Sequence, residues 1–462
     1  MMDIFSYIRQ NKEKLTQGFV FFVLGIFYLF TRFFLFVREG VASFGYDTGI
    51  YRHYIDGYFT RLHDSELTPF AFSGYSNFLK ALGVSTDHIL ITWYFGIAIF
   101  LFVIFFCFVK SFTNTWTALI ALFLFSVSIV QYEFFWWFYY RNFISFGLVF
   151  VSLILFHFRS FLVIFPLMAL GTLHVLTLIP VGLTMMVLWC VQKQNRKYYL
   201  LSGSIVLLGI IGLNFQEFSL YFTQAKQIGI SGQNLQSEYS EFNGQFIDGW
   251  FFLKYTFFVL VLGLIGSVKY YKKYPEMALL GLFSLIPLLL GILFYRRFFV
   301  FLDVCTIFFA SVFVFHSIQS YKSVWVRSAL GIGGAVLIFL SINFVVHKQP
   351  LFTREELAQV QKTNDLAPAR LLSISSGTAP WLYGFTHHQV IAPGLFEHDV
   401  WTESEWQEFW TTQNLERRHD LLNRYSSPVY IFVAESERRF ESTLAGDAHF
   451  VQRQPFLWEY IP

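Results

Sequence analysis

The chain has 462 residues, of which 55% are hydrophobic and only 14% are charged. Soluble proteins of this size carry roughly a quarter charged residues, so the composition excludes an ordinary soluble domain. The formal net charge of +3 is too small to indicate a nucleic-acid partner. The three cysteines all fall within apolar runs, which excludes a disulfide framework in the exposed parts.

Apolar runs of about twenty residues recur from Phe19 onward, each long enough to cross a hydrocarbon core about 30 Å thick. The sequence therefore predicts a mainly α-helical, polytopic transmembrane bundle of about eleven spans. The first run follows a basic segment and lacks a small-residue cleavage site, which indicates an uncleaved signal anchor. The expected spans cover residues 19–37, 89–109, 116–130, 143–158, 198–215, 250–268, 277–294, 298–318 and 328–346, with a further apolar stretch at 161–191.

The stretch 161–191 is too long for one span and too short for two full ones with a loop. Pro166 and Pro180 interrupt it, and His174 lies between them. We expect a broken hairpin of short helices, which a bundle tolerates where protein or a cavity satisfies the backbone. His174 is then an intramembrane histidine, and it is either a substrate-binding residue or a neutral, satisfied core residue.

Basic short loops such as "QKQNRKYY" and "KYYKKY" predict a cytoplasmic N-terminus in the plasma (inner) membrane. The outer loops are then 38–88, 131–142 and 216–249. An odd span count also places the tail outside. We divide the chain into a transmembrane module at 1–346 and an extracytoplasmic α/β domain at 347–462. In the tail, "RLLSISS" and "PVYIFVAE" indicate strands, and "ESEWQEFWTTQNLERRHDLLNRY" indicates an amphipathic helix.

The first outer loop opens with "FGYDTGIYRHYIDGY", in which Asp47 lies beside Tyr46 and Tyr51 at the apolar boundary. A partly desolvated carboxylate is either paired or used, so Asp47 is a candidate general base. Alternatively, Asp47 caps the helix that follows. Tyr51 and Arg52 are candidate substrate contacts, although a structural ion pair between Arg52 and Asp56, four residues apart, is the simpler explanation for the arginine.

Arg296 and Arg297 fall in "FYRRF", at a tight outer turn between two spans. An arginine pair suits a phosphate or pyrophosphate bidentately. The alternative is snorkelling at the membrane interface. The positive charge on the outer side runs against the usual charge bias, which favours the phosphate hypothesis.

A third cluster is "QYEFFWWFYYRN", which an aromatic belt explains in part. Glu133 is a candidate second acid or cation ligand, and Arg141 and Asn142 are candidate contacts to sugar or phosphate. Four further acids of the long outer loop are alternatives to Glu133: Glu217, Glu238, Glu241 and Asp248. In the tail, His387, His388, His398 and Asp399 fit no standard zinc spacing.

Taken together, these segments resemble the GT-C superfamily of polytopic glycosyltransferases, which use polyprenyl-phosphate-linked sugars. The resemblance rests on "GYDTGIYRHY" after the first span, "YRN" opening a later span, "LHVL" in the broken hairpin, "FYRRF" at an outer turn and the α/β tail. The tail segment "HHQVIAPGLFEHDVW" also looks like those of bacterial members. The layout covers most of the chain, whereas the individual motifs are short.

The resemblance implies an inverting transfer in which Asp47 deprotonates the acceptor hydroxyl and Arg297, with Arg296, holds the leaving phosphate. The donor would be a polyprenyl-phosphate sugar, and the acceptor a glycan, a lipid or a protein at the extracytoplasmic face. Many members carry paired acids in the first loop, whereas Thr48 follows Asp47 here. This departure argues against a metal-dependent reaction, although a divalent cation (Mg²⁺ or Mn²⁺) stays an alternative.

No P-loop, glycine-rich nucleotide fingerprint or Ser/His/Asp elbow occurs in the sequence, so the donor must arrive activated. Two other functions stay open. A polymerase or ligase of lipid-linked oligosaccharide would carry an arginine or histidine in a large outer loop. A transporter or flippase would favour paired mid-membrane charges and an inverted repeat.

Overall fold

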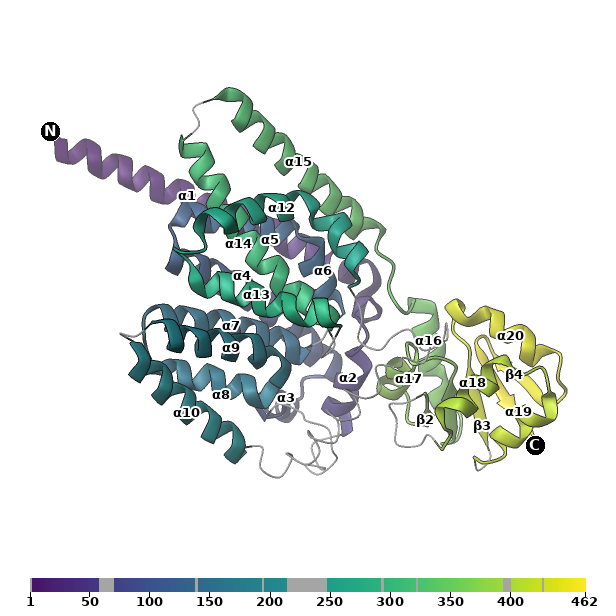
Figure 1. The fold of residues 1–462 in the computed structure, drawn as a ribbon. Coiled ribbons are helices and arrows are strands. Elements are labelled where there is room, and N and C mark those ends of the chain that lie inside the picture. The colour runs from purple at the N-terminus through teal and green to yellow at the C-terminus, as the bar shows by residue number, and fades with distance from the viewer. Residues whose placement is uncertain are drawn as a thin grey trace. The chain divides into compact units, whose positions relative to one another are not determined.

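The computed structural model describes residues 2–57, 70–137, 140–192, 195–213, 247–291, 295–320, 323–393, 400–425 and 428–462 (Figure 1). The chain forms two compact units. The first takes in Met1–Phe34, Trp93–Gly229 and Phe246–Lys348, and the second Leu35–Thr92, Ile230–Gln245 and Gln349–Pro462.

The first unit is a helical bundle, and the predicted mainly α-helical fold is confirmed. Helices α1 (Met2–Glu39) and α4 (Thr86–Phe112) belong to it except for the end of α1 after Phe34 and the start of α4 before Trp93, which belong to the second unit. The other helices of the first unit are α5 (Thr115–Val127), α6 (Ile129–Trp136), α7 (Tyr140–His157), α8 (Ile164–Leu173), α9 (Val175–Val191), α10 (Arg196–Leu213), α12 (Gly249–Tyr270), α13 (Pro275–Leu290), α14 (Phe299–Ser320) and α15 (Val324–His347). Short 3₁₀ helices, η3 (Phe161–Val163) and η6 (Tyr295–Phe298), precede α8 and α14.

Six helices of the described residues are long and apolar enough to cross a membrane, or seven if the bent pair α5 and α6 is one span. The protein is therefore a multi-pass membrane protein, but the expectation of about eleven spans is not confirmed. The physical reason is length. Helices α8 and α13 have 10 and 16 residues, which at about 1.5 Å per residue fall short of a core about 30 Å thick.

The expected short helices at 161–191 are confirmed, with one correction. The break falls at His174, which has an extended backbone (φ −160°) between α8 and α9. Neither proline marks the break, because Pro166 lies in the first turn of α8 and Pro180 lies inside α9. Gly171 lets α8 approach α10 closely: a Cβ there would lie 2.2 Å from the Cδ1 atom of Ile210.

The bent span α5–α6 turns by 58° at Ser128 and is held by two buried charges. The guanidinium of Arg32 donates to the carbonyls of Phe125 and Ser126 at the end of α5. The carboxylate of Asp303 accepts from Ser128 and Gln131 at the start of α6, at 2.8 and 2.9 Å. A cation at a helix C-terminus and an anion at an N-terminus both oppose the helix dipole charges, which stabilises the break.

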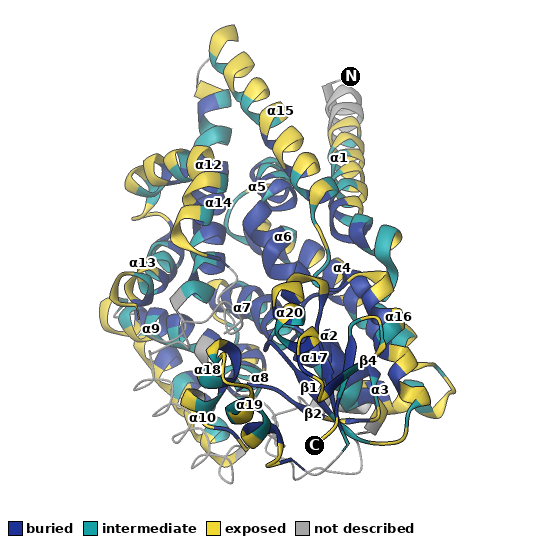
Figure 2. Ribbon diagram, turned by 90° about the vertical axis from the view of Figure 1, so that its right-hand side faces the viewer, coloured by how far each residue is buried: buried dark blue, intermediate teal, exposed yellow. Residues whose placement is uncertain are grey.

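The second unit contains a five-stranded sheet with the order β2-β1-β3-β5-β4. The strands are β1 (Arg370–Ser373), β2 (Gln389–Ile391), β3 (Val429–Phe432), β4 (Phe450–Gln454) and β5 (Leu457–Tyr460). Strand β1 runs parallel to β2 and β3, whereas β5 runs antiparallel to β3 and β4. Figure 2 shows the strands as largely buried.

Helices cover both faces of this sheet: α16 (Arg354–Lys362), α17 (Ala379–Phe385), α18 (Glu403–Thr411), α19 (Leu415–Leu422) and α20 (Arg438–Ala445). Alternate residues of one strand enter different cores, as Leu371 and Leu372 do. The predicted strands are confirmed, but the single predicted helix is two. Asn414 separates them because its side chain accepts from the Arg417 backbone N–H and starts α19 anew.

The second unit also contains part of the first loop: η1 (Gly40–Ser43), α2 (Thr48–Gly57) and α3 (Phe70–Ala81). Helix α2 lies directly against α17, since a Cβ on Gly49 would come within 1.6 Å of the Pro380 carbonyl oxygen. A Cβ on Gly384 would likewise meet the Gly49 carbonyl oxygen at 2.2 Å. Only glycine permits backbones to approach this closely.

Candidate active site

Asp47 immediately precedes α2 and is half-buried. Its carbonyl accepts the first helical bond, from the Tyr51 N–H at 3.0 Å, so it stands at the N-cap position. The pKa of the neighbouring Tyr46 phenol is raised above its ordinary value, mainly by burial and secondly by the negative charge of Asp47. A cap position does not exclude catalysis, and the role of general base stays a prediction.

Arg52 is engaged within the second unit. Its guanidinium pairs with Asp56 and Asp87, each at 3.0 Å, and donates to the Gly384 carbonyl at 2.5 Å. It also lies over the Phe385 ring, 4.4 Å from the centroid. The ion pair with Asp56 is the one that the spacing suggested. These contacts favour an anchoring role for Arg52, which ties α2 to α17, over the predicted substrate contact. Tyr51, its neighbour on α2, is buried.

Three of the predicted binding residues come together in the first unit. The Nη1 atom of Arg297, in η6, lies 3.4 Å from Nε2 of His174, at the break between α8 and α9. The Nδ1 atom of His174 lies 2.7 Å from the Thr177 hydroxyl. Arg297 and Arg141 both interact electrostatically with the His174 ring. This cationic cluster, defined as Arg297, His174 and Arg141, joins segments that are far apart in sequence.

Two other predicted residues lie next to the cationic cluster along the chain. Arg296 is half-buried and adjoins Arg297 in η6. Asn142 is buried and follows Arg141 in the first turn of α7. Their roles in binding sugar or phosphate stay predictions.

Glu133 is buried in α6 and forms an ion pair with Lys348, the residue that follows α15. The Lys348 ammonium also lies 3.7 Å from the centroid of the Trp136 ring. These contacts give Glu133 a structural partner 215 positions away, which no local pattern indicates. They favour an anchoring role, and the role of second acid stays a prediction.

The other acids and histidines that the sequence singles out have different outcomes. Asp248 caps α12 by accepting from the Phe251 N–H at 2.6 Å. His388 is buried and bonded to the Thr363 carbonyl and the Ala369 N–H, which makes it structural. The remaining candidates lie outside the described residues: Glu217, Glu238, Glu241, His398 and Asp399.

Sequence reasoning missed two buried charges, Arg32 and Asp303, which hold the break at Ser128. A signal for both was present, because each charge interrupts an apolar run and an intramembrane charge calls for a partner. The identity of that partner depends on packing and is not visible in the sequence.

No protein-family model matches the chain, and no curated protein matches it in sequence. Solved structures do match. One is the oligosaccharyltransferase of Archaeoglobus fulgidus in the apo form, with a TM-score of 0.61 and 11% identity over 93% of this chain and 71% of that chain. A second is the archaeal oligosaccharyltransferase AglB from the same organism, in complex with an inhibitory peptide and a dolichol-phosphate, with a TM-score of 0.58 and 12% identity over 97% and 74% of the two chains.

A third match is the Archaeoglobus fulgidus oligosaccharyltransferase in complex with Zn and sulfate, with a TM-score of 0.50 and 12% identity over 96% of this chain and 73% of that chain. At this level of identity the likeness establishes the fold and leaves the chemistry to the residues. The chain thus has the fold of these oligosaccharyltransferases, and the predicted architecture of a transmembrane helical bundle with a small α/β domain is confirmed.

Proposed function

We propose that the protein is a membrane-embedded glycosyltransferase that moves a sugar from a polyprenyl-phosphate donor to an extracytoplasmic acceptor. The observation that carries the proposal is the cationic cluster of Arg297, His174 and Arg141, within a bundle that has the fold of oligosaccharyltransferases. The planar guanidinium groups suit a phosphate headgroup, and the bundle suits its lipid tail.

The comparisons support the class of donor. A structure with this fold holds a dolichol-phosphate together with an inhibitory peptide. Another holds sulfate, which resembles phosphate in shape and charge, together with Zn. We extend only the general chemistry to this chain: a lipid phosphate as donor and a glycan, lipid or protein as acceptor.

In the proposed reaction, Asp47 accepts the proton of an acceptor hydroxyl. The acceptor oxygen then forms a bond to the anomeric carbon, and the bond from that carbon to the phosphate oxygen breaks. The lipid phosphate leaves with the electron pair, and the configuration inverts. Arg297, assisted by Arg296 and Arg141, stabilises the charge on the leaving phosphate. No step of this mechanism runs through a divalent cation.

The proposed setting is the plasma membrane, with the N-terminus in the cytoplasm and the reaction on the outer side. In that topology η6 and the start of α7 share the outer side, where a lipid-linked sugar is presented. Asn142 and Tyr51 are the proposed polar and aromatic contacts to sugar. Arg52 and Glu133 are assigned mainly to holding α2 and α6 in place.

The experiment is direct binding of undecaprenyl phosphate to the full-length protein in detergent, measured by native mass spectrometry. Arg297→Ala should weaken binding about 10-fold or more, since a charge-assisted phosphate contact contributes roughly 1.5–3 kcal/mol. Arg327→Ala is the matched control, because Arg327 is an exposed arginine at the start of α15 in the same unit.

Equal binding by the wild type and by both variants would remove the phosphate-site assignment. Equal losses in both variants would point to general charge attraction, which would also contradict it. Thermal unfolding of each variant establishes that the fold is intact.

A further inference from the structure

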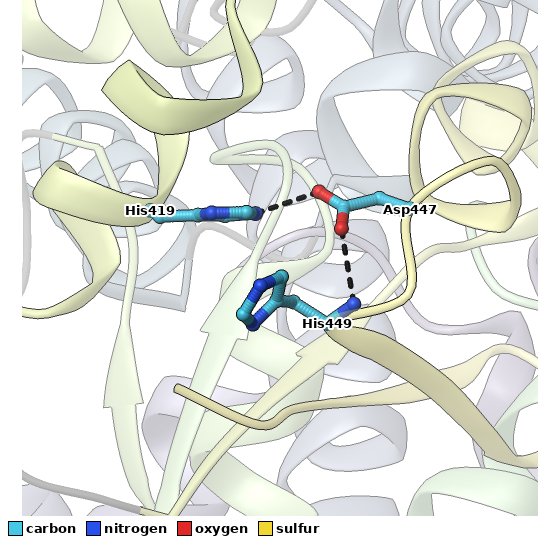
Figure 3. Close-up of side chains that lie close together, drawn as sticks. All are labelled: His419, Asp447 and His449. Atoms are coloured by element: carbon cyan, nitrogen blue, oxygen red, sulfur yellow. Dashed lines mark hydrogen bonds and ion pairs between the residues drawn. The ribbon is translucent and has the colours of Figure 1, made fainter.

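Three metal-ligating side chains, none of which is assigned to transfer, meet in the α/β domain. They are His419, Asp447 and His449 (Figure 3). His419 lies on α19, and the other two lie on the turn between α20 and β4. Each side chain offers one ligand atom, and these three atoms all lie within 4.8 Å of one another.

The turn places Asp447 and His449 on the same side. The backbone N–H of His449 donates to Oδ1 of Asp447 at 3.0 Å, and the Phe450 N–H donates to the Asp447 carbonyl at 3.1 Å. The other carboxylate oxygen, Oδ2, lies 2.6 Å from Nε2 of His419. The two imidazole rings lie close together, with centroids 4.3 Å apart.

The hydrogen bonds also prepare the ligand atoms. Nδ1 of His449 lies 2.8 Å from the Ile461 carbonyl, so it donates a proton there and leaves the lone pair on Nε2. A histidine that ligates a metal through one nitrogen commonly donates from the other to a carbonyl in this way.

We propose that His419, Asp447 and His449 form a binding site for Zn²⁺ or a similar divalent transition metal. Two imidazole nitrogens and one carboxylate oxygen are a ligand set that zinc prefers, and a water would complete a tetrahedral set. Mg²⁺ and Mn²⁺ favour oxygen ligands, so this site differs from the cation considered for transfer.

The metal would act on structure, because it joins α19 to the turn before β4 and, through His449, to the last residues of the chain. His419 already contacts the ring of Tyr460 on β5, with centroids 5.7 Å apart. Binding to the native state alone raises the free energy of unfolding in proportion to the logarithm of metal concentration. Zinc should therefore raise the thermal midpoint of the domain.

The test uses the full-length protein in detergent, stripped with EDTA and titrated with Zn²⁺ or, as a spectroscopic probe, Co²⁺. The wild type should retain one Zn²⁺ per chain after dialysis and show the visible bands of tetrahedral Co²⁺. His449→Gln removes one ligand while it keeps the backbone N–H and the His419–Asp447 pair. Affinity should fall about 10-fold or more.

His387→Gln is the matched control, because the His387 ring lies next to that of His388, with centroids 4.4 Å apart, and an adjacent histidine pair is an alternative metal binder. Retention of zinc by His387→Gln and its loss in His449→Gln supports the proposal. A wild type that retains no zinc overturns it, as does zinc lost from His387→Gln but kept by His449→Gln. Neither readout depends on transfer activity.

Discussion

Buried ionic side chains carry much of the information at the residue scale. Arg32, Asp303, Glu133 and Lys348 all lie in the first unit, and each has a partner in another segment of the chain. Breaking a buried pair leaves an uncompensated charge, whereas removing both partners is often tolerated. This asymmetry separates structural charges from catalytic ones.

Glu133 and Lys348 offer a direct case. Lys348→Met should destabilise the protein by about 3–5 kcal/mol, because it leaves the Glu133 carboxylate, with 4% of its side chain exposed, without its cation. Glu133→Gln should be milder, since Lys348 is 18% exposed and can be hydrated. The double variant should recover most of the loss, as thermal unfolding in detergent would measure.

Transfer activity of the same double variant decides the role of Glu133. If the pair is structural, activity returns with stability. A stable double variant without activity would contradict the anchoring role and restore Glu133 as the second acid.

The sequence alone predicts which residues are candidates for the site, but not how they come together in space. Arg297, His174 and Arg141 are each conspicuous because an ionisable side chain near or within an apolar run is costly. Their convergence was not visible, since it depends on how η6, the α8–α9 break and α7 pack. The same holds for His419, Asp447 and His449, whose ligand spacing follows no local pattern.

At the element scale, the contact between α2 and α17 fixes the helix that Asp47 precedes. Gly49→Ala should destabilise the second unit by about 1–3 kcal/mol, because the new methyl would overlap the Pro380 carbonyl and force the helices apart. Transfer should fall further than stability alone explains, since the displacement moves Asp47. Thermal unfolding and transfer would be measured on the same samples.

Gly446→Ala is the control for that substitution. Gly446 lies in the second unit too, directly after α20, with a φ of −89° and no neighbouring atom within 4 Å of the added Cβ. Unchanged stability in both variants would show that α2 and α17 do not approach as described.

Local sequence patterns predicted several helices and strands, but they failed where capping or packing determines the helix boundaries. The apolar stretch at 161–191 indicated short helices, but the break depended on His174 and not on the prolines. The amphipathic pattern of the tail suggested one helix, whereas the Asn414 cap divides it. The predicted count of about eleven spans is not confirmed in the described residues, because short helices such as α8 and α13 are as apolar as the long ones.

At the scale of the whole molecule, the fold is compatible with a glycosyltransferase and with a transporter or flippase for lipid-linked sugars. A transporter or flippase for lipid-linked sugars would also bind polyprenyl phosphate through the cationic cluster. Transfer is what separates an enzyme from such a carrier, and transfer needs a base as well as a phosphate site. Asp47 is therefore the residue on which the central claim depends.

The decisive measurement is the release of polyprenyl phosphate by the full-length protein in liposomes, with a panel of undecaprenyl-phosphate hexoses and pentoses and a cell-envelope extract as acceptor. The wild type should release lipid phosphate from one donor, and Asp47→Asn should reduce the rate about 10²–10⁴-fold with unchanged thermal stability. Asp365→Asn, at an exposed aspartate of the same unit, should retain full activity. Release by Asp47→Asn at the wild-type rate, or no release from any donor by the wild type, would contradict the account.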